Sequence, residues 1–192
     1  MRTPPTGAHD GARPSSGSSS PELPEDVARA VVLRRLAMGP RTRFQLREAV
    51  LAKDVPEPVA DAVLDRFAEV GLIDDAEFAR DWVRIRHRDK GLARRALSDE
   101  LRRKGVDPDL VEAALNSVDA NDERGAAEAL VAKKLPGSRG LAYPKRVNRL
   151  VGMLARKGYG PGLAGEVVRR ALAAEHDGTP DDGTSDDDRS PF

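Results

Sequence analysis

The chain has 192 residues, no cysteine, and 32 basic against 32 acidic residues. Without cysteine it can form no disulfide, no thiolate nucleophile and no Cys-ligated zinc site. Only 4% of the residues are aromatic and 33% are charged, which favours helices over sheets and argues against a large aromatic core. No apolar run reaches the roughly 20 residues that span a bilayer, and the N-terminus lacks the apolar region of a secretory signal. We therefore expect a cytoplasmic protein.

Charge is divided unevenly along the chain. Residues 25–175 hold 29 Lys and Arg against 24 Asp and Glu, and most of the remaining acid lies beyond His176. Residues 1–24 are rich in Pro, Gly and Ser, whereas residues 177–192 are strongly acidic. Neither segment carries enough apolar surface to offset the entropy of ordering. The sequence therefore predicts a disordered tail at each end.

Between the tails the sequence repeats three times, at intervals of about fifty residues. The turn Lys104-Gly105-Val106 has one counterpart 51 residues earlier, Lys53-Asp54-Val55, and another 53 residues later, Lys157-Gly158-Tyr159. Each turn lies between two segments of helical periodicity. Glycine adopts the left-handed conformation of such a turn at little cost. Asp54 departs from the pattern, because aspartate tolerates that conformation less well.

The first repeat is predicted over residues 25–73. Its first helix covers about 25–37, and the apolar side of this helix carries Val27, Val31 and Leu33. Thr42 and Gln45 have the spacing of a capping box and predict the start of the second helix. Pro58 lies near the start of the third helix, where proline is favoured.

The second repeat is predicted over residues 74–119. Asp74 and Glu77 again have the spacing of a capping box. Phe78, Trp82 and Ile85 then recur on one face of a helix, and we expect the two aromatic residues, like Phe67, to pack in the core. Gly91 separates this helix from the next, and Asp107 before Pro108 predicts the capped start of the third helix.

The third repeat is predicted over residues 120–176. Its first helix covers about 122–135, a longer loop follows over 136–144, and Pro161 lies near the start of the last helix. A module of this size buries too little surface to be comfortably stable alone, so neighbouring modules should pack together. The predicted fold is all-α, with three tandem three-helix repeats in an elongated, curved array.

Catalytic chemistry finds little support in the sequence. His9 and His176 lie in or beside the tails, and His87 stands among arginines without a second ligand at metal spacing. His87 is predicted to be an exposed helix residue. The glycines of residues 160–165 lack the following Lys-Ser/Thr of a phosphate-binding loop. We expect a protein that is not an enzyme and that holds neither a metal nor a cofactor.

Basic side chains form stripes on the predicted helices of the second and third repeats. From Arg80 to Lys104 there are ten Lys and Arg against four Asp and Glu. Such stripes suit a polyanion or the acidic surface of another protein. The candidate residues for binding a partner or DNA are Arg80, Arg84, Arg88, Lys90, Arg94, Arg95, Arg102, Arg103, Lys145, Arg146 and Arg149.

The run GLIDDAEFARDWVRIR, followed by a glycine, a leucine and ELRRKGV, resembles the RecX family of bacterial RecA regulators. The resemblance covers about residues 25–174 and includes the triple repeat. The residues of the run that carry it are Gly71, Leu72, Asp74, Asp75, Phe78, Ala79, Trp82, Arg86, Gly91, Leu97, Glu100, Leu101, Lys104 and Gly105. The combination is specific, although each piece alone would be a weak signal.

The resemblance implies a modulator that acts by binding. Members of this family bind the RecA filament on single-stranded DNA, lie in its helical groove, and suppress its ATPase, strand-exchange and co-protease activities. The implied partners are therefore the RecA filament and single-stranded DNA, the latter mainly through the filament. An elongated array could contact several protomers at once and so multiply weak contacts.

Two alternatives remain open at this stage. Residues 42–73 also resemble a helix-turn-helix segment, which would make the chain a DNA-binding transcriptional regulator, but no strand pair follows Ile73 and the predicted reading helix, 58–67, is net acidic. A purely structural scaffold is the second alternative. We expect a monomer, because no repeat shows a surplus apolar face.

Overall fold

The computed structural model describes residues 23–177, and these residues are all helical apart from turns and short connections. The helices in chain order are α1 (Pro24–Ala37), α2 (Arg43–Leu51), α3 (Glu57–Glu69), α4 (Asp75–Lys90), α5 (Arg94–Arg103), α6 (Pro108–Leu115), α7 (Ala120–Lys134), the 3₁₀-helix η1 (Pro136–Ser138), α8 (Tyr143–Arg156) and α9 (Pro161–Asp177). The predicted tails lie outside the described residues, except for residues 23 and 24 at the start of α1 and residue 177 at the end of α9.

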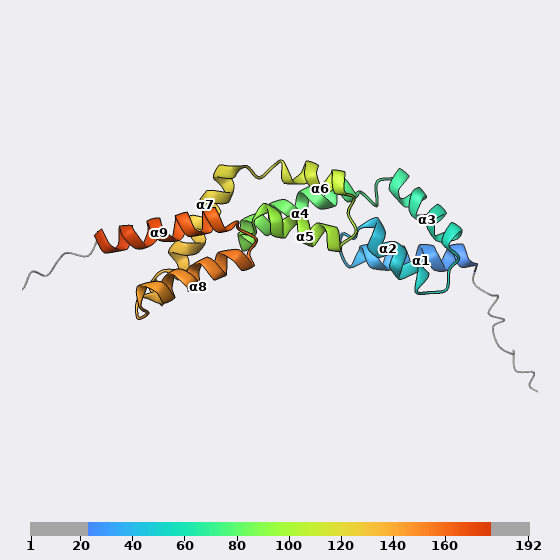
Figure 1. Cartoon of the computed structure of the whole chain (residues 1–192). Coiled ribbons are helices and arrows are strands. Elements are labelled where there is room, and N and C mark those ends of the chain that lie inside the picture. The colour runs from blue at the N-terminus through green and yellow to red at the C-terminus, as the bar shows by residue number, and fades with distance from the viewer. Residues whose placement is uncertain (1–22, 178–192) are drawn as a thin grey trace, which may run out of the picture.

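The helices form three three-helix repeats that follow one another in an elongated, gently curved array (Figure 1). Helices α1–α3 make the first repeat, α4–α6 the second and α7–α9 the third. Each repeat has its own cluster of buried apolar side chains, and the extensive helix–helix packing lies within repeats. The predicted fold class is therefore confirmed.

Most predicted helix starts have the expected chemistry. Thr42 and Gln45 form a complete capping box at α2, and the Asp107 side chain accepts a hydrogen bond from the Asp109 backbone N–H at α6. Asp74 accepts from the Glu77 N–H at 2.7 Å. The Glu77 side chain does not return the bond, so this start is a simple N-cap rather than a capping box.

The first helix of each repeat packs through a narrow stripe of small residues, which differs from the predicted stripe in the first and second repeats. The fully buried residues are an alanine and a valine four positions apart, namely Ala28 and Val32 on α1, Ala79 and Val83 on α4, and Ala127 and Val131 on α7. On α1 the predicted core residue Leu33 is instead 49% exposed. Small side chains let the first helix approach its two partners closely, so the larger apolar residues beside this stripe are displaced toward the surface.

The junction between the first and second repeats joins the start of α2 to the turn after α5. The Thr42 hydroxyl donates to the Lys104 carbonyl oxygen at 2.6 Å, and the Arg43 N–H donates to the Asp75 carboxylate at 2.9 Å. Phe44 lies against Gly105, whose φ is +74°. Thr42 is fully buried, so its hydroxyl both caps α2 and links two repeats.

The junction between the second and third repeats joins the start of α5 to the turn after α8 in a related manner. The Ala93 N–H donates to the Lys157 carbonyl oxygen at 2.9 Å, and the Arg94 N–H donates to the Glu123 carboxylate at 2.6 Å. Gly158, with φ +91°, lies directly beneath the Ala96 backbone. The same geometry thus recurs at both junctions, which gives the array its regular course.

Asp54 occupies the corresponding turn of the first repeat and adopts the left-handed conformation, with φ +57°. It is exposed, and no hydrogen bond from another repeat reaches this turn within residues 23–177. Gly105 and Gly158 must leave room for a docked helix end, whereas Asp54 need not. The departure from glycine in the first repeat is therefore sterically tolerated.

Candidate partner-binding groove

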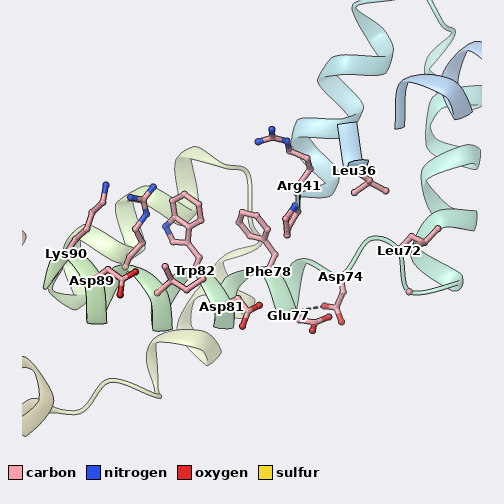
Figure 2. A pocket seen from close by; sticks show the side chains of 14 residues that line it. Leu36, Arg41, Leu72, Asp74, Glu77, Phe78, Asp81, Trp82, Asp89 and Lys90 are labelled. Atoms are coloured by element: carbon pink, nitrogen blue, oxygen red, sulfur yellow. Dashed lines mark hydrogen bonds between the residues drawn. The ribbon is translucent and has the colours of Figure 1, made fainter. Parts of the chain in front are cut away.

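A groove of about 770 Å³ runs along α4 and the end of the first repeat. Figure 2 shows it with the side chains that surround it. The lining comes from three segments, and its members are Leu36, Pro40, Arg41, Gly71, Leu72, Asp74, Glu77, Phe78, Asp81, Trp82, Ile85, Arg86, Asp89 and Lys90. The groove therefore depends on how the first repeat is placed against the second.

Two stacked aromatic rings form the centre of the groove. The centroids of Phe78 and Trp82 lie 5.6 Å apart with an interplanar angle of 17°. The Trp82 Nε1–H donates to a Glu100 carboxylate oxygen at 2.8 Å, which holds the indole in one orientation. Both rings pack on the second core from the side and are only half buried. The expectation that they are simple core residues is therefore only partly correct.

Cations surround the aromatic pair on the side of α5. The Arg86 Cζ atom lies 4.3 Å from the Trp82 ring centroid, and the Lys104 Nζ atom lies 4.1 Å from it on the same indole. Cation–π contacts of this kind stabilise the charges and fix the side chains. Arg86 also lies 3.5 Å from the Glu100 carboxylate, so Glu100 serves both the indole and the guanidinium.

Positive charge exceeds negative charge in this cluster. Burial lowers the pKa of Lys104, and the nearby Arg41 and Arg86 lower it further, whereas Glu100 opposes the shift. The Nε atom of Arg41 is buried without a hydrogen-bond partner among residues 23–177. We call Arg41 and Arg86, which line the groove, together with Lys104, which contacts Trp82 but does not line it, the basic edge of the groove. An added anion there would favour the charged form of Lys104.

The opposite edge of the groove is acidic. Asp74, Glu77 and Asp81 lie three or four residues apart, hence on one side of α4, and Figure 2 shows Glu77 and Asp81 away from Arg41 across the helix. Asp81 pairs with Arg84 at 2.7 Å on the exposed surface. We call these three residues the acidic edge. The groove thus has an aromatic and aliphatic centre between edges of opposite charge.

The predicted basic residues fall into three groups in the structure. Arg84 pairs with Asp81, and Arg88 pairs with its neighbour Asp89 at 2.8 Å, in exposed positions where such pairs contribute little. Seven others are exposed and have no ion pair within residues 23–177: Arg80, Lys90, Arg95, Arg102, Arg103, Lys145 and Arg149. These seven remain candidates for binding an anionic surface.

The other two predicted residues have structural partners. The Arg94 guanidinium donates to the carbonyl oxygens of Leu115 and Val118, at 2.6 and 2.7 Å, and so closes the end of α6. Arg146 pairs with Glu175 and also donates to the Ser138 hydroxyl, which ties α8 to α9 and η1. The structure therefore gives both guanidinium groups a folding role that their sequence positions did not indicate.

Two further expectations need correction. His87 is half buried rather than exposed, and its Nδ1 atom lies 2.9 Å from the Leu92 carbonyl oxygen, so the ring bridges the turn after α4. The chain does carry a surplus apolar surface where the first and second repeats meet, because Leu72 before α4 and Ile85 on α4 are 54% and 44% exposed and line the same groove as the aromatic pair. The sequence contained a signal for this face, since α4 has two adjacent apolar stripes where one core contact needs only one.

Within residues 23–177 there is no cluster of three or more His, Asp or Glu that could hold a metal ion. No helix of this part of the chain is both long and apolar enough to cross a membrane. The fold defines a tandem helical-repeat protein with a partly apolar groove at a repeat junction.

The chain belongs to the RecX family. Residues 28–67 match the family model described as the first three-helix domain of RecX, and residues 74–115 match the second three-helix domain. The regulatory protein RecX of Streptomyces coelicolor is 49% identical over 176 residues, which cover 90% of this chain and 94% of the relative. That of Thermobifida fusca is 50% identical over 162 residues, or 84% and 88% of the two chains.

Solved structures share the fold. A crystal structure of RecX from Lactobacillus salivarius superposes with a TM-score of 0.70 at 18% identity and covers 78% of this chain and 97% of the other. A second crystal structure of a regulatory protein RecX gives 0.67 at 21% identity, over 77% and 72%. The recognition made from the sequence is confirmed. Six of the fourteen residues that carry the family resemblance line the groove, namely Gly71, Leu72, Asp74, Phe78, Trp82 and Arg86. Two others contact Trp82: Glu100 from α5 and Lys104 from the turn after it.

Proposed function

We propose that the chain binds the RecA filament on single-stranded DNA and inhibits its ATPase, strand-exchange and co-protease activities. It would act as a cytoplasmic, non-enzymatic monomer that modulates recombination and DNA repair. The observation that carries the proposal is the set of seven exposed, unpaired basic side chains on α4, α5 and α8, within a member of the RecX family. They extend over two rigidly joined repeats and so suit an extended, anionic assembly.

The junction geometry supports this proposal. Both junctions fix a helix end against a turn by backbone or buried hydrogen bonds. A stiff array loses little conformational entropy when it lies along a filament, and contacts at several protomers then reinforce one another. A flexible string of modules would lose much of that advantage.

A sequence-specific DNA regulator is less well supported. Helix α3 would be the reading helix, and its carboxylates hold the nearby cations: Asp61 accepts from Arg47 at 2.8 Å, and Asp65 pairs with Arg43 at 2.8 Å. The hydrogen bond from Arg47 lowers the pKa of Asp61, so this carboxylate stays ionised. A reading helix with such a surface would repel the phosphates that flank a base edge.

The test is a titration of the full chain into RecA–single-stranded DNA filaments while ATP hydrolysis is followed. We expect a dose-dependent fall in the hydrolysis rate. An unchanged rate at stoichiometric excess, with helical content confirmed by circular dichroism, would contradict the proposal, and a footprint on duplex DNA without RecA would favour the regulator instead.

A charge-reversal variant sharpens the test. Replacing Arg95, Arg102 and Arg103 by Glu should weaken filament binding and reduce its salt dependence, because three exposed cations are lost from one helix. The control replaces Arg34 and Arg35 by Glu; both are exposed on α1 and lie outside the candidate set. Equal loss in both variants would indicate nonspecific charge attraction.

A further inference from the structure

The groove along α4 presents more apolar surface than the second core requires. Ala79 and Val83 already bury the inner side of this helix completely. Ile85 and Leu72 nevertheless extend the aromatic pair into a continuous apolar strip on the outer side. Single exposed apolar residues occur elsewhere on the chain, such as Met38 and Val70. In the groove, however, they adjoin a stacked aromatic pair, and contiguous apolar patches mark interaction sites.

The shape of the groove favours a helical occupant. Its floor follows α4, a helix of 16 residues, which corresponds to a length of roughly 24 Å. A partner helix of three or four turns would span it, with apolar residues at i, i+3, i+4 and i+7 on the strip. The two edges would then face the flanks of that helix.

The charges of the two edges select the chemistry of the occupant. On the basic edge Arg41, Arg86 and the adjoining Lys104 face one carboxylate, Glu100. The acidic edge holds three carboxylates, of which only Asp81 has an ion pair in the described residues. Lys90 and Asp89 near the end of α4 also line the groove and add one charge of each sign. A nucleic-acid strand would gain at the basic edge and be repelled by the acidic edge. A helix with acidic residues on one flank and basic residues on the other would gain at both.

We propose that this groove binds an amphipathic α-helix of the partner protein, with carboxylates toward Arg41, Arg86 and Lys104 and basic side chains toward Glu77 and Asp81. The inference rests on the proposed function, because it makes the groove the site at which a protein subunit of the filament is held. It deepens that function by assigning recognition of the protein to the groove. Of the seven unpaired cations only Lys90 lines the groove, and the other six are left to contact phosphate groups.

The first test places a charge in the apolar strip. Ile85→Glu should weaken binding to RecA–single-stranded DNA filaments by at least about tenfold, as expected for a central apolar contact. Leu33→Glu is the matched control, because Leu33 is 49% exposed on α1 against 44% for Ile85 on α4, and it does not line the groove. The control should bind like the unmodified chain.

The second test reverses the acidic edge. Asp81→Lys should weaken filament binding several-fold if basic side chains of a partner helix face this edge, and it should leave binding to bare single-stranded DNA unchanged or slightly stronger. If Asp81→Lys instead strengthens filament binding while Ile85→Glu weakens binding to bare DNA, the occupant is nucleic acid and the proposal is overturned.

Other outcomes separate the inference from the proposed function. If the unmodified chain leaves RecA hydrolysis unchanged, the proposed function fails first. If it inhibits and Ile85→Glu inhibits equally well, the groove proposal alone fails. If the chain self-associates and Ile85→Glu abolishes this, a second copy is the occupant. Trp82 is the chain's only tryptophan, so a change in its fluorescence when residues 1–22 or 178–192 are removed would assign the groove to one of those segments. Either result overturns the proposal.

Discussion

The two junctions between repeats share one geometry but use different chemistry. At the first junction the bond to the turn carbonyl comes from a side chain, the buried Thr42 hydroxyl, and the Phe44 ring lies on Gly105. At the second junction the corresponding bond comes from the backbone N–H of Ala93 to Lys157, Ala96 lies on Gly158, and the Tyr159 hydroxyl adds a bond to Gly91. A turn glycine is therefore the common requirement, and the packing on it differs. The groove adjoins the first junction.

The largest effect on stability is expected when a methyl group is added to the turn glycine of the second junction. A Cβ at residue 158 would lie 2.6 Å from the Ala96 backbone nitrogen, at a φ of +91°. We expect Gly158→Ala to lower the free energy of unfolding by about 3 kcal/mol, from the clash and the left-handed strain together. Chemical denaturation followed by circular dichroism measures the change.

Two matched variants give this prediction its controls. In Gly105→Ala the new Cβ would overlap both Cγ and Cβ of Phe44. Rotation of the side chain cannot move the Cβ of Phe44, so the cost should again be about 3 kcal/mol. Gly160→Ala meets no atom within 4 Å and should be nearly neutral. A much smaller loss for Gly105→Ala than for Gly158→Ala would show that the start of α2 can shift away from its turn more easily than the start of α5.

Removal of the Thr42 hydroxyl tests the side-chain chemistry of the first junction. Thr42→Ala should cost about 2 kcal/mol, since it removes the N-cap of α2 and leaves the Lys104 carbonyl without its donor. Thr42→Ser keeps the hydroxyl and should retain most of the stability. A loss in the serine variant as large as in the alanine variant would assign the effect to the methyl group. Thermal unfolding with the two variants side by side decides between them.

At the second junction the Tyr159 side chain joins the third repeat to the second. Its hydroxyl donates to the Gly91 carbonyl oxygen at 3.1 Å, and burial raises its pKa to about 12. Tyr159→Phe should cost about 1 kcal/mol at neutral pH.

The pH dependence of folding stability that comes from the Tyr159 hydroxyl has a defined sign. A phenol with a raised folded-state pKa contributes stability that is present below its unfolded pKa of about 10 and is lost as the pH rises through about 12. The unmodified chain should therefore lose more stability than Tyr159→Phe between those values. Parallel curves for the two chains would show that the ring is not desolvated in solution.

The smallest effect on stability is expected at Asp54, in the turn of the first repeat, against which no helix end packs. Asp54→Gly relieves the left-handed strain at φ +57° and should stabilise the first repeat by about 0.5 kcal/mol. The reverse change, Gly158→Asp, should be strongly destabilising because Ala96 occupies the space. We expect Asp54→Gly to raise the denaturation midpoint by more than a neutral surface substitution does.

Helical periodicity, turn glycines and capping residues were sufficient to predict the all-helical repeat. These features act over a few residues, so they can be recognised along the chain without knowledge of distant contacts. The capping box of Thr42 and the cap of Asp107 are examples that the structure confirms. The sequence run around Phe78, Trp82 and Lys104 likewise indicated the correct family.

Periodicity alone could not decide which stripe of α4 faces the core. Phe78, Trp82 and Ile85 have the larger apolar surface, yet Ala79 and Val83 are the residues that are fully buried. Their small size permits close packing against the other helices of the repeat, and that choice depends on the partners rather than on α4 itself.

Long-range contacts decided the roles of the charged residues. Arg94 and Arg95 are neighbours in the sequence, but only Arg94 reaches the carbonyl oxygens at the end of α6. The basic edge gathers Arg41 from one repeat with Arg86 and Lys104 from the next. The local sequence thus determined the helices, the turns and the number of repeats. Only the tertiary structure determined which cations remain free and where the groove lies, because guanidinium partners and helix-end docking join residues that are far apart in the chain.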